Sequence, residues 1–151
     1  MTKHRKVYIA LFMAYAAWML WLLFDRPGYT SGIPYWEQAA SHLNLMPLRT
    51  LKLFANLLTH RNPALVRVAV INLFGNVLLF IPLGLFLPLI WYQLRKLRKV
   101  LLYTGLIISF VELIQLVTLV GSCDIDDLIL NLVGAALGYG IYKTINKKAA
   151  S

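Results

Sequence analysis

Several polar residues lie within or at the edge of three long apolar stretches, at residues 68–91, 100–120 and 125–142, and seven of them are the candidates for a site. They are Asn72, Asn76, Glu112, Gln115, Asp124, Asp127 and Asn131. Polar side chains are costly inside a bilayer, and where they occur they mark ligand sites, proton paths or paired contacts between helices. Carboxylates and amides together can hydrogen-bond a polar ligand, hold a divalent cation or transfer protons. We treat these seven residues as a candidate ligand-binding cluster.

Their spacing predicts one shared location. Asn72 and Asn76 are four residues apart, and Glu112 and Gln115 are three apart, so each pair lies on one face of its helix. At about 1.5 Å of rise per residue, the polar residues lie roughly 3–12 Å below the expected outer ends of their helices. Independent defects would not share a depth. We expect a single polar cluster that faces the bundle interior and is reachable from outside.

Structural roles remain open for most of these residues. The two asparagines can simply form hydrogen bonds between helices. Asp124 can cap the helix that follows it, and Asp127 can favour that helix's positive N-terminus. Glu112 is harder to explain this way, because a carboxylate this deep must be protonated or paired. Its candidate partners are Gln115, Asn72, Asn76 and Arg67.

Small residues predict where helices approach closely. Gly75 adjoins the asparagines, and Gly134 and Gly138 form a small-xxx-small pair. Such pairs let helix backbones pack against each other. We expect these three glycines to serve helix packing, and a homodimer through Gly134 and Gly138 is left open.

Metal and cofactor chemistry have weak support. The run Asp124-Ile125-Asp126-Asp127 is too short for an EF-hand loop and lacks its glycine. No histidine adjoins the carboxylates, and no nucleophile–base pair is visible. The single cysteine, Cys123, excludes an internal disulfide and a cysteine-based zinc site. We predict no metal and no cofactor.

The composition indicates a membrane protein that positions these residues on helices. Of 151 residues, 60% are hydrophobic and 14% are charged, and the mean hydropathy is +0.68. Soluble domains average roughly 45–50% apolar residues, and disordered chains have fewer. Four spans are expected, at about 7–24, 68–91, 100–120 and 125–142, each close to the roughly 20 residues that cross a bilayer. The first lacks a small-residue cleavage site, so we expect it to be retained rather than removed as a signal peptide.

The predicted fold is an all-α, four-transmembrane-helix bundle forming one domain over residues 1–151. Residues 25–67 form an outer loop, with Pro27 and Gly28 in its irregular first part. Within it, a short amphipathic helix at about 47–58 is expected to lie on the outer membrane surface, with Pro47 in its first turn.

Basic residues predict the orientation. The segments before the first span, between the second and third, and after the fourth hold ten of the fifteen lysines and arginines and no acidic residue. By the positive-inside rule, both termini are expected in the cytoplasm. The net charge of +9 is then a topology signal with some attraction to anionic lipid, and we predict no nucleic-acid partner.

The sequence resembles the VanZ family of bacterial membrane proteins. The matching segments are NLMPLRTL (44–51), NLFGNVLLFIPLG (72–84), SFVELIQL (109–116) and GSCDIDDLILNLVGAALGY (121–139). Some members carry an arginine shortly before the aspartates, which residues 119–122 lack. The resemblance implies a four-helix protein of the bacterial cell membrane and low-level resistance to glycopeptide antibiotics, teicoplanin more than vancomycin. It implies the seven polar residues as the family's characteristic set, without settled catalytic roles.

Three functions follow as hypotheses. The leading one is non-enzymatic binding, at the polar cluster, of a lipoglycopeptide antibiotic, a lipid-linked cell-wall precursor or another membrane lipid. The alternative is an intramembrane enzyme that uses Glu112 and the aspartates on an envelope lipid or the antibiotic. Transport by a monomer is least favoured, because the chain shows no internal repeat.

Overall fold

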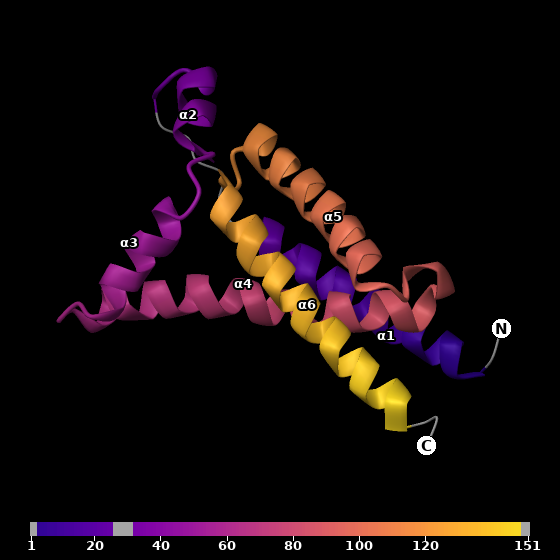
Figure 1. The fold of residues 1–151 in the computed structure, drawn as a ribbon. Helices are drawn as coiled ribbons and strands as arrows, with labels where there is room; N and C mark the ends of the chain where they lie inside the picture. The colour runs from indigo at the N-terminus through magenta and orange to yellow at the C-terminus, as the bar shows by residue number, and fades with distance from the viewer. Residues whose placement is uncertain (1–2, 26–31, 149–151) are drawn as a thin grey trace.

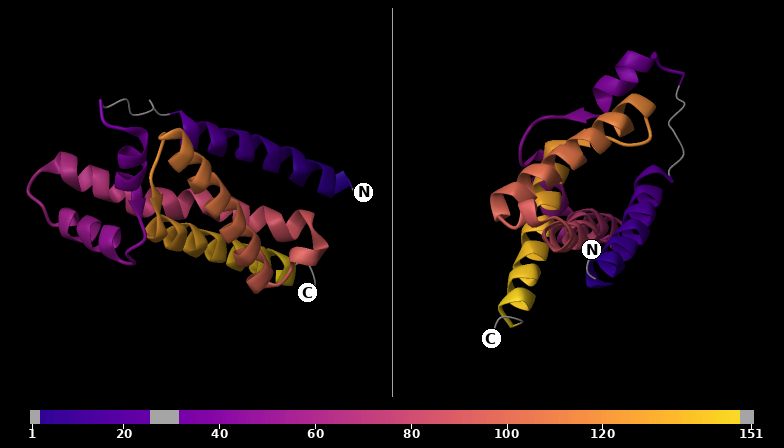
Figure 2. Two further views of the ribbon diagram at one scale, coloured as in Figure 1. Left: turned by 90° about the horizontal axis from the view of Figure 1, so that it is seen from above. Right: turned by 90° about the vertical axis from the view of Figure 1, so that its right-hand side faces the viewer.

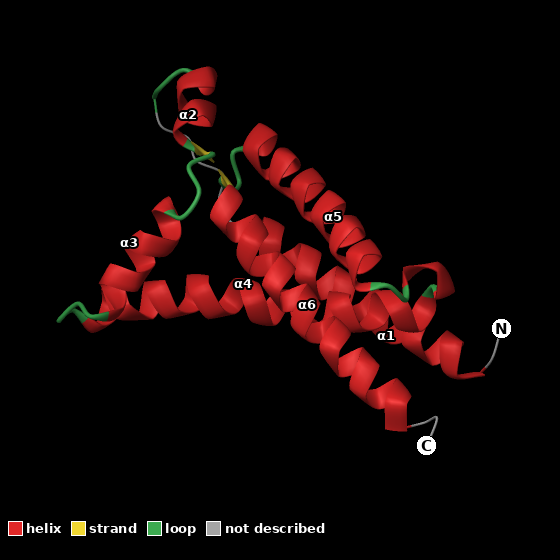
Figure 3. Ribbon diagram, in the orientation of Figure 1, coloured by secondary structure: helices red, strands yellow, loops and turns green. Residues whose placement is uncertain are grey.

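The computed structural model of this chain describes residues 3–25 and 32–148, so the expected loop residues Pro27 and Gly28 lie outside the described part. Its long helices are α1 (Lys3–Phe24), α4 (Pro63–Ile90), α5 (Leu97–Thr118) and α6 (Ile125–Lys148). All four are long and apolar enough to cross a membrane (Figures 1 and 3). This confirms the predicted all-α, four-span fold.

Shorter elements fill the segment between α1 and α4 and the two later connections. They are α2 (Tyr35–Ser41), β1 (Leu43–Asn44), α3 (Arg49–Leu58), the 3₁₀ turn η1 (Tyr92–Leu94) and β2 (Cys123–Asp124). Leu43 pairs with Cys123 and Asn44 with Asp124 in a two-residue parallel bridge. This bridge fastens the long α1–α4 segment to the connection between α5 and α6.

Several helices run beyond the apolar stretches that predicted them. α4 begins at Pro63 because the side chain of Asn62 accepts a hydrogen bond from the Ala64 amide at 3.0 Å. Proline suits that first helical position, where its missing N–H is not needed. α3, by contrast, begins at Arg49. Pro47 therefore precedes the helix instead of starting it, because Leu48 has a left-handed backbone with φ of 66°.

The four long helices place both ends of the chain at one end of the bundle, opposite α2 and α3 (Figures 1 and 2). α4 is the central helix: it makes its most extensive contact with α6 and also packs on α1, α3 and α5. Its residues Phe80, Leu83 and Leu87 lie in the main hydrophobic core.

Glycine allows α4 and α6 to cross at very short range. A Cβ at Gly134 or Gly138 would meet the backbone carbonyl of Val77 or Ile81 on α4. Gly84 of α4 does the same against Ala135 of α6. One prediction therefore needs correction. Gly75 is not at a helix contact, because a Cβ there would meet only Ile71 of its own helix, at 4.0 Å. The contact of Gly134 and Gly138 is with α4 of the same chain rather than with a second copy, and a homodimer itself stays a prediction.

Candidate functional site

Two buried carboxylates, one at the end of β2 and one in the first turn of α6, hold the start of α3. Asp126, fully buried, accepts backbone hydrogen bonds from Leu48 at 2.6 Å, Thr50 at 2.8 Å and Leu51 at 3.0 Å. These donors are the amides that a helix start leaves without partners inside the helix. A carboxylate there also interacts favourably with the helix dipole. Asp126 thus stabilises α3 from a helix that begins some 75 residues later.

Asp124 adds to the same contact between the start of α6 and the start of α3, which we call the α3–α6 joint. Its Oδ2 accepts from the Thr50 hydroxyl at 2.6 Å and from the Asn44 amide at 3.1 Å. Its Oδ1 accepts from the backbone N–H of Asp126 at 2.9 Å. Asp124 was predicted to belong to the polar cluster, but it does not line the cavity described next, because both of its oxygens are turned toward this joint.

The other six predicted residues line one cavity between the helices. α4 contributes Asn72 and Asn76, α5 contributes Glu112 and Gln115, and α6 contributes Asp127 and Asn131. Its volume is about 90 Å³. The structure therefore brings together residues separated by up to about 60 positions in the chain, as the shared depth predicted, while their role in binding stays a prediction.

Some cavity side chains also fasten the helices to one another. The amide of Asn76 donates to Asp127 Oδ1 at 2.6 Å, which ties α4 to α6. The amide of Gln115 donates to the backbone carbonyl of Leu23 at 2.8 Å, which ties α5 to the end of α1. The amide of Asn72 donates to the backbone carbonyl of Val68 in its own helix, so this hydrogen bond does not connect two helices.

Two buried acceptors on the cavity wall have no hydrogen-bond partner among residues 3–25 and 32–148. Glu112 is 8% exposed and Asn131 is 5% exposed. Glu112 Oε1 and Asn131 Oδ1 make no hydrogen bond with any part of the chain that the structure describes. A buried polar atom left unpaired costs about 1–3 kcal/mol, so these two atoms favour a guest that donates hydrogen bonds. Neither Gln115, Asn72, Asn76 nor Arg67 is the partner of Glu112: its Oε2 instead accepts from the Cys123 thiol at 3.8 Å.

The size of the cavity limits what it can hold. A volume of about 90 Å³ accommodates several water molecules, since a site for one needs about 10–15 Å³. Pockets for drug-sized ligands occupy roughly 300–1,000 Å³. The cavity therefore fits a small polar group and not a whole antibiotic.

Burial, followed by the neighbouring Glu112 carboxylate, raises the pKa of the Cys123 thiol above its ordinary value. Because the thiolate is the reactive form, we expect Cys123 to alkylate more slowly at neutral pH than an exposed cysteine. The comparison is iodoacetamide labelling of the purified chain against a Cys123→Ser, Thr59→Cys variant, whose thiol replaces an exposed side chain. Equal rates would contradict this assignment.

The comparison with protein families is decisive here. The VanZ/LLP1 family model matches residues 9–146, which include the whole cavity wall. The chain belongs to the VanZ/LLP1 family. It is also similar to Protein VanZ from Enterococcus faecium, with 37% identity over 76 residues, or 50% of this chain and 47% of that protein. The match spans about half the length of that relative. No solved structure matches the chain.

In this VanZ/LLP1 chain, the fold places only some of the carboxylates that the alternative function, an intramembrane enzyme, would need at the cavity. That alternative used Glu112 together with Asp124, Asp126 and Asp127. Asp124 and Asp126 are bound to α3, so two carboxylates remain at the cavity. Among the described residues, no group of three or more His, Cys, Asp or Glu is placed to hold a metal ion.

Sequence reasoning missed three features of the site. Ser122 and Gly121, in the α5–α6 connection, also line the cavity. Gly84 takes the packing role assigned to Gly75. Gly84 lies eight residues after Asn76 and so on the same helix face, and that spacing is a signal that could have identified it. The contact between Asp126 and α3 carried no comparable signal.

Proposed function

We propose that this chain is a binding protein of the bacterial cell membrane that lowers susceptibility to teicoplanin-like glycopeptides. It does so by holding part of the drug or of an envelope lipid at the polar cavity. The resistance role comes from the VanZ resemblance and the relative named Protein VanZ. The observation that carries the binding role is the convergence of six polar side chains from three spanning helices on one cavity with two unpaired acceptors.

The expected orientation puts this cavity in the outer half of the membrane. Basic residues gather at the end of the bundle that holds both termini: Arg5 near the start of α1, Arg95 and Lys96 between α4 and α5, and Lys99 in the first turn of α5. The positive-inside rule assigns that end to the cytoplasm. The cavity lies near the opposite ends of α1 and α5, where envelope lipids and acylated drugs meet the outer leaflet.

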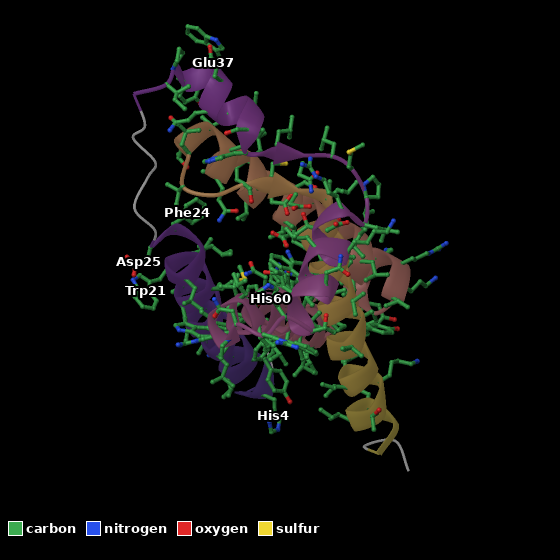
Figure 4. All side chains as sticks on the ribbon, turned by 90° about the vertical axis from the view of Figure 1, so that its left-hand side faces the viewer. His4, Trp21, Phe24, Asp25, Glu37 and His60 are labelled. Carbon is green, nitrogen blue, oxygen red and sulfur yellow. The ribbon has the colours of Figure 1, made fainter. Side chains whose placement is uncertain are left out.

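We expect Glu112→Ala and Asn76→Ala to return a teicoplanin-resistant host expressing this chain to its parental susceptibility. Each change removes a polar cavity side chain, and losing one such interaction weakens binding about tenfold. The measurement is a susceptibility panel with glycopeptides, with membrane abundance followed by immunoblot. Glu37→Ala is the matched control, because that carboxylate is exposed on α2 (Figure 4) and does not line the cavity.

Asn76 also ties α4 to α6, so abundance must be equal before its result is interpreted. If both cavity variants keep full resistance at unchanged abundance, the proposed function is wrong. If resistance falls only where abundance falls, the cavity has a structural role and the proposal fails as well.

A further inference from the structure

A groove on the lipid-facing side of the bundle adjoins the polar cavity. It runs between α1 and α4, has a volume of about 370 Å³, and is lined mostly by apolar residues such as Trp18, Leu78 and Pro82. Leu23, Asn72 and Asn76 line both the groove and the cavity. The two spaces therefore share one wall, apolar on the membrane side and polar on the inside.

Gly75 keeps this groove open. It lies in the groove wall, and a Cβ added there would meet only the Ile71 side chain, at 4.0 Å. The other α4 glycine, Gly84, is needed for contact with α6, but none of the described helices comes within 4 Å of a Cβ at Gly75 apart from α4 itself. The absent side chain thus leaves room in the groove without serving the fold.

The charges of the cavity decide which head group fits. Glu112 and Asp127 line it, and among the residues that the structure describes no lysine or arginine does. A phosphate or carboxylate would face two carboxylates without a compensating cation, and an isolated charge is itself costly at this depth. The unpaired atoms, Glu112 Oε1 and Asn131 Oδ1, instead suit a guest with O–H donors.

The groove itself gives little selectivity, because a lipid tail leaves equally apolar surroundings when it enters. Its volume lies within the roughly 300–1,000 Å³ range of pockets for organic ligands, whereas the cavity fits only a small head. The polar contacts must therefore select the guest, and the groove must admit its chain from the side.

We propose that the cavity and the groove form one site for a lipid of the bilayer with a small, uncharged, hydroxyl-bearing head such as glycerol. The head occupies the polar cavity and one acyl chain lies between α1 and α4. The inference rests on the proposed function, because it names the ligand class of the same cavity.

The test uses the full chain in phosphatidylcholine nanodiscs and a monoacylglycerol with a photoactivatable diazirine in its acyl chain. The contrast probe is lysophosphatidic acid with the same chain, which differs only by its phosphate. We expect monoacylglycerol to label the peptides around Trp18 and Leu78 about tenfold more than the phosphate probe does. Equal or stronger labelling by lysophosphatidic acid would overturn the proposal.

Groove-filling variants supply the second arm. Gly75→Leu is expected to reduce monoacylglycerol labelling about tenfold by filling the groove. Gly140→Leu, at a helix position with nothing within 4 Å, should leave it unchanged. Should Gly75→Leu fold poorly, Ile71→Trp fills the groove from its exposed rim, and Val70→Trp, next to it but outside the groove, is its control. Labelling that survives in folded groove variants would refute the site.

Failure of this inference can be told from failure of the proposed function. If Gly75→Leu loses labelling but keeps the resistance, the lipid site stands and the resistance role does not depend on it. If folded groove variants label like the wild type while Glu112→Ala loses resistance, the lipid inference fails and the proposed function stands.

Discussion

Asp126→Ala is expected to lower the free energy of unfolding by at least about 3 kcal/mol, because it leaves three backbone N–H groups at the start of α3 without their acceptor. The carboxylate is fully buried, so water cannot replace it without opening the joint. The loss should also release α3 from α6, since the amides of Leu48, Thr50 and Leu51 have this one side chain as acceptor.

The measurement is the thermal unfolding midpoint of the purified chain in detergent, with membrane abundance as a second readout. Asp126→Asn should lower the free energy of unfolding less, by about 1–2 kcal/mol. One side-chain oxygen remains to accept a hydrogen bond, while the amide N–H₂ faces backbone donors. Asp25→Ala is the control, since this exposed carboxylate lies at the end of α1, on the rim of the molecule (Figure 4). An Asp126→Ala protein as stable as that control would show that α3 is held by other contacts.

Asp126 also shows what a sequence can and cannot predict about this protein. Apolar length and the few charges are enough to locate four spans, because a bilayer admits little besides apolar helices. Helical spacing is enough to bring Asn76, Glu112 and Asn131 to one level. Both signals are local, and each depends on one helix and the membrane rather than on which helices are neighbours.

The roles within Asp124-Ile125-Asp126-Asp127 depend instead on tertiary contacts. These three acids are equivalent as candidates for a helix N-terminus, yet Asp127 faces Asn76 while Asp124 and Asp126 face α3. The deciding partner is the start of α3, a segment distant in the chain and helical only after Leu48 adopts its left-handed backbone. Nothing in the spacing of the acids predicts that partner, so the sequence could not separate the cavity residue from the two structural ones.

The same limit separates Gly75 from Gly84. Both are glycines of one apolar helix, and the sequence favoured Gly75 because it adjoins the asparagines. Which of them meets a second helix depends on where α6 crosses α4, and that crossing is fixed by Gly134 and Gly138 on the other helix. A packing motif read on one helix therefore predicts that a close contact exists but not which residue completes it.

Gly138→Ala tests that crossing and should be among the most damaging single-methyl additions to this fold. A Cβ at Gly138 would meet the carbonyl of Ile81 and, at 2.9 Å, the backbone nitrogen of Leu85. Backbone atoms cannot rotate away as a side chain can, so α4 and α6 must separate. Overpacking of this kind costs about 1–3 kcal/mol, and separation of the most extensive helix pair in the bundle also loosens the Asn76–Asp127 contact beside it.

Gly140→Ala is the matched control, two residues along the same helix, where an added Cβ meets nothing within 4 Å. There the change should be neutral or stabilising by up to about 1 kcal/mol, because alanine favours a helix more than glycine does. Thermal unfolding of both variants in detergent gives the comparison. A Gly138→Ala protein with the midpoint of Gly140→Ala would mean that the two helices do not approach as closely as described, and the cavity between them would then need a different wall.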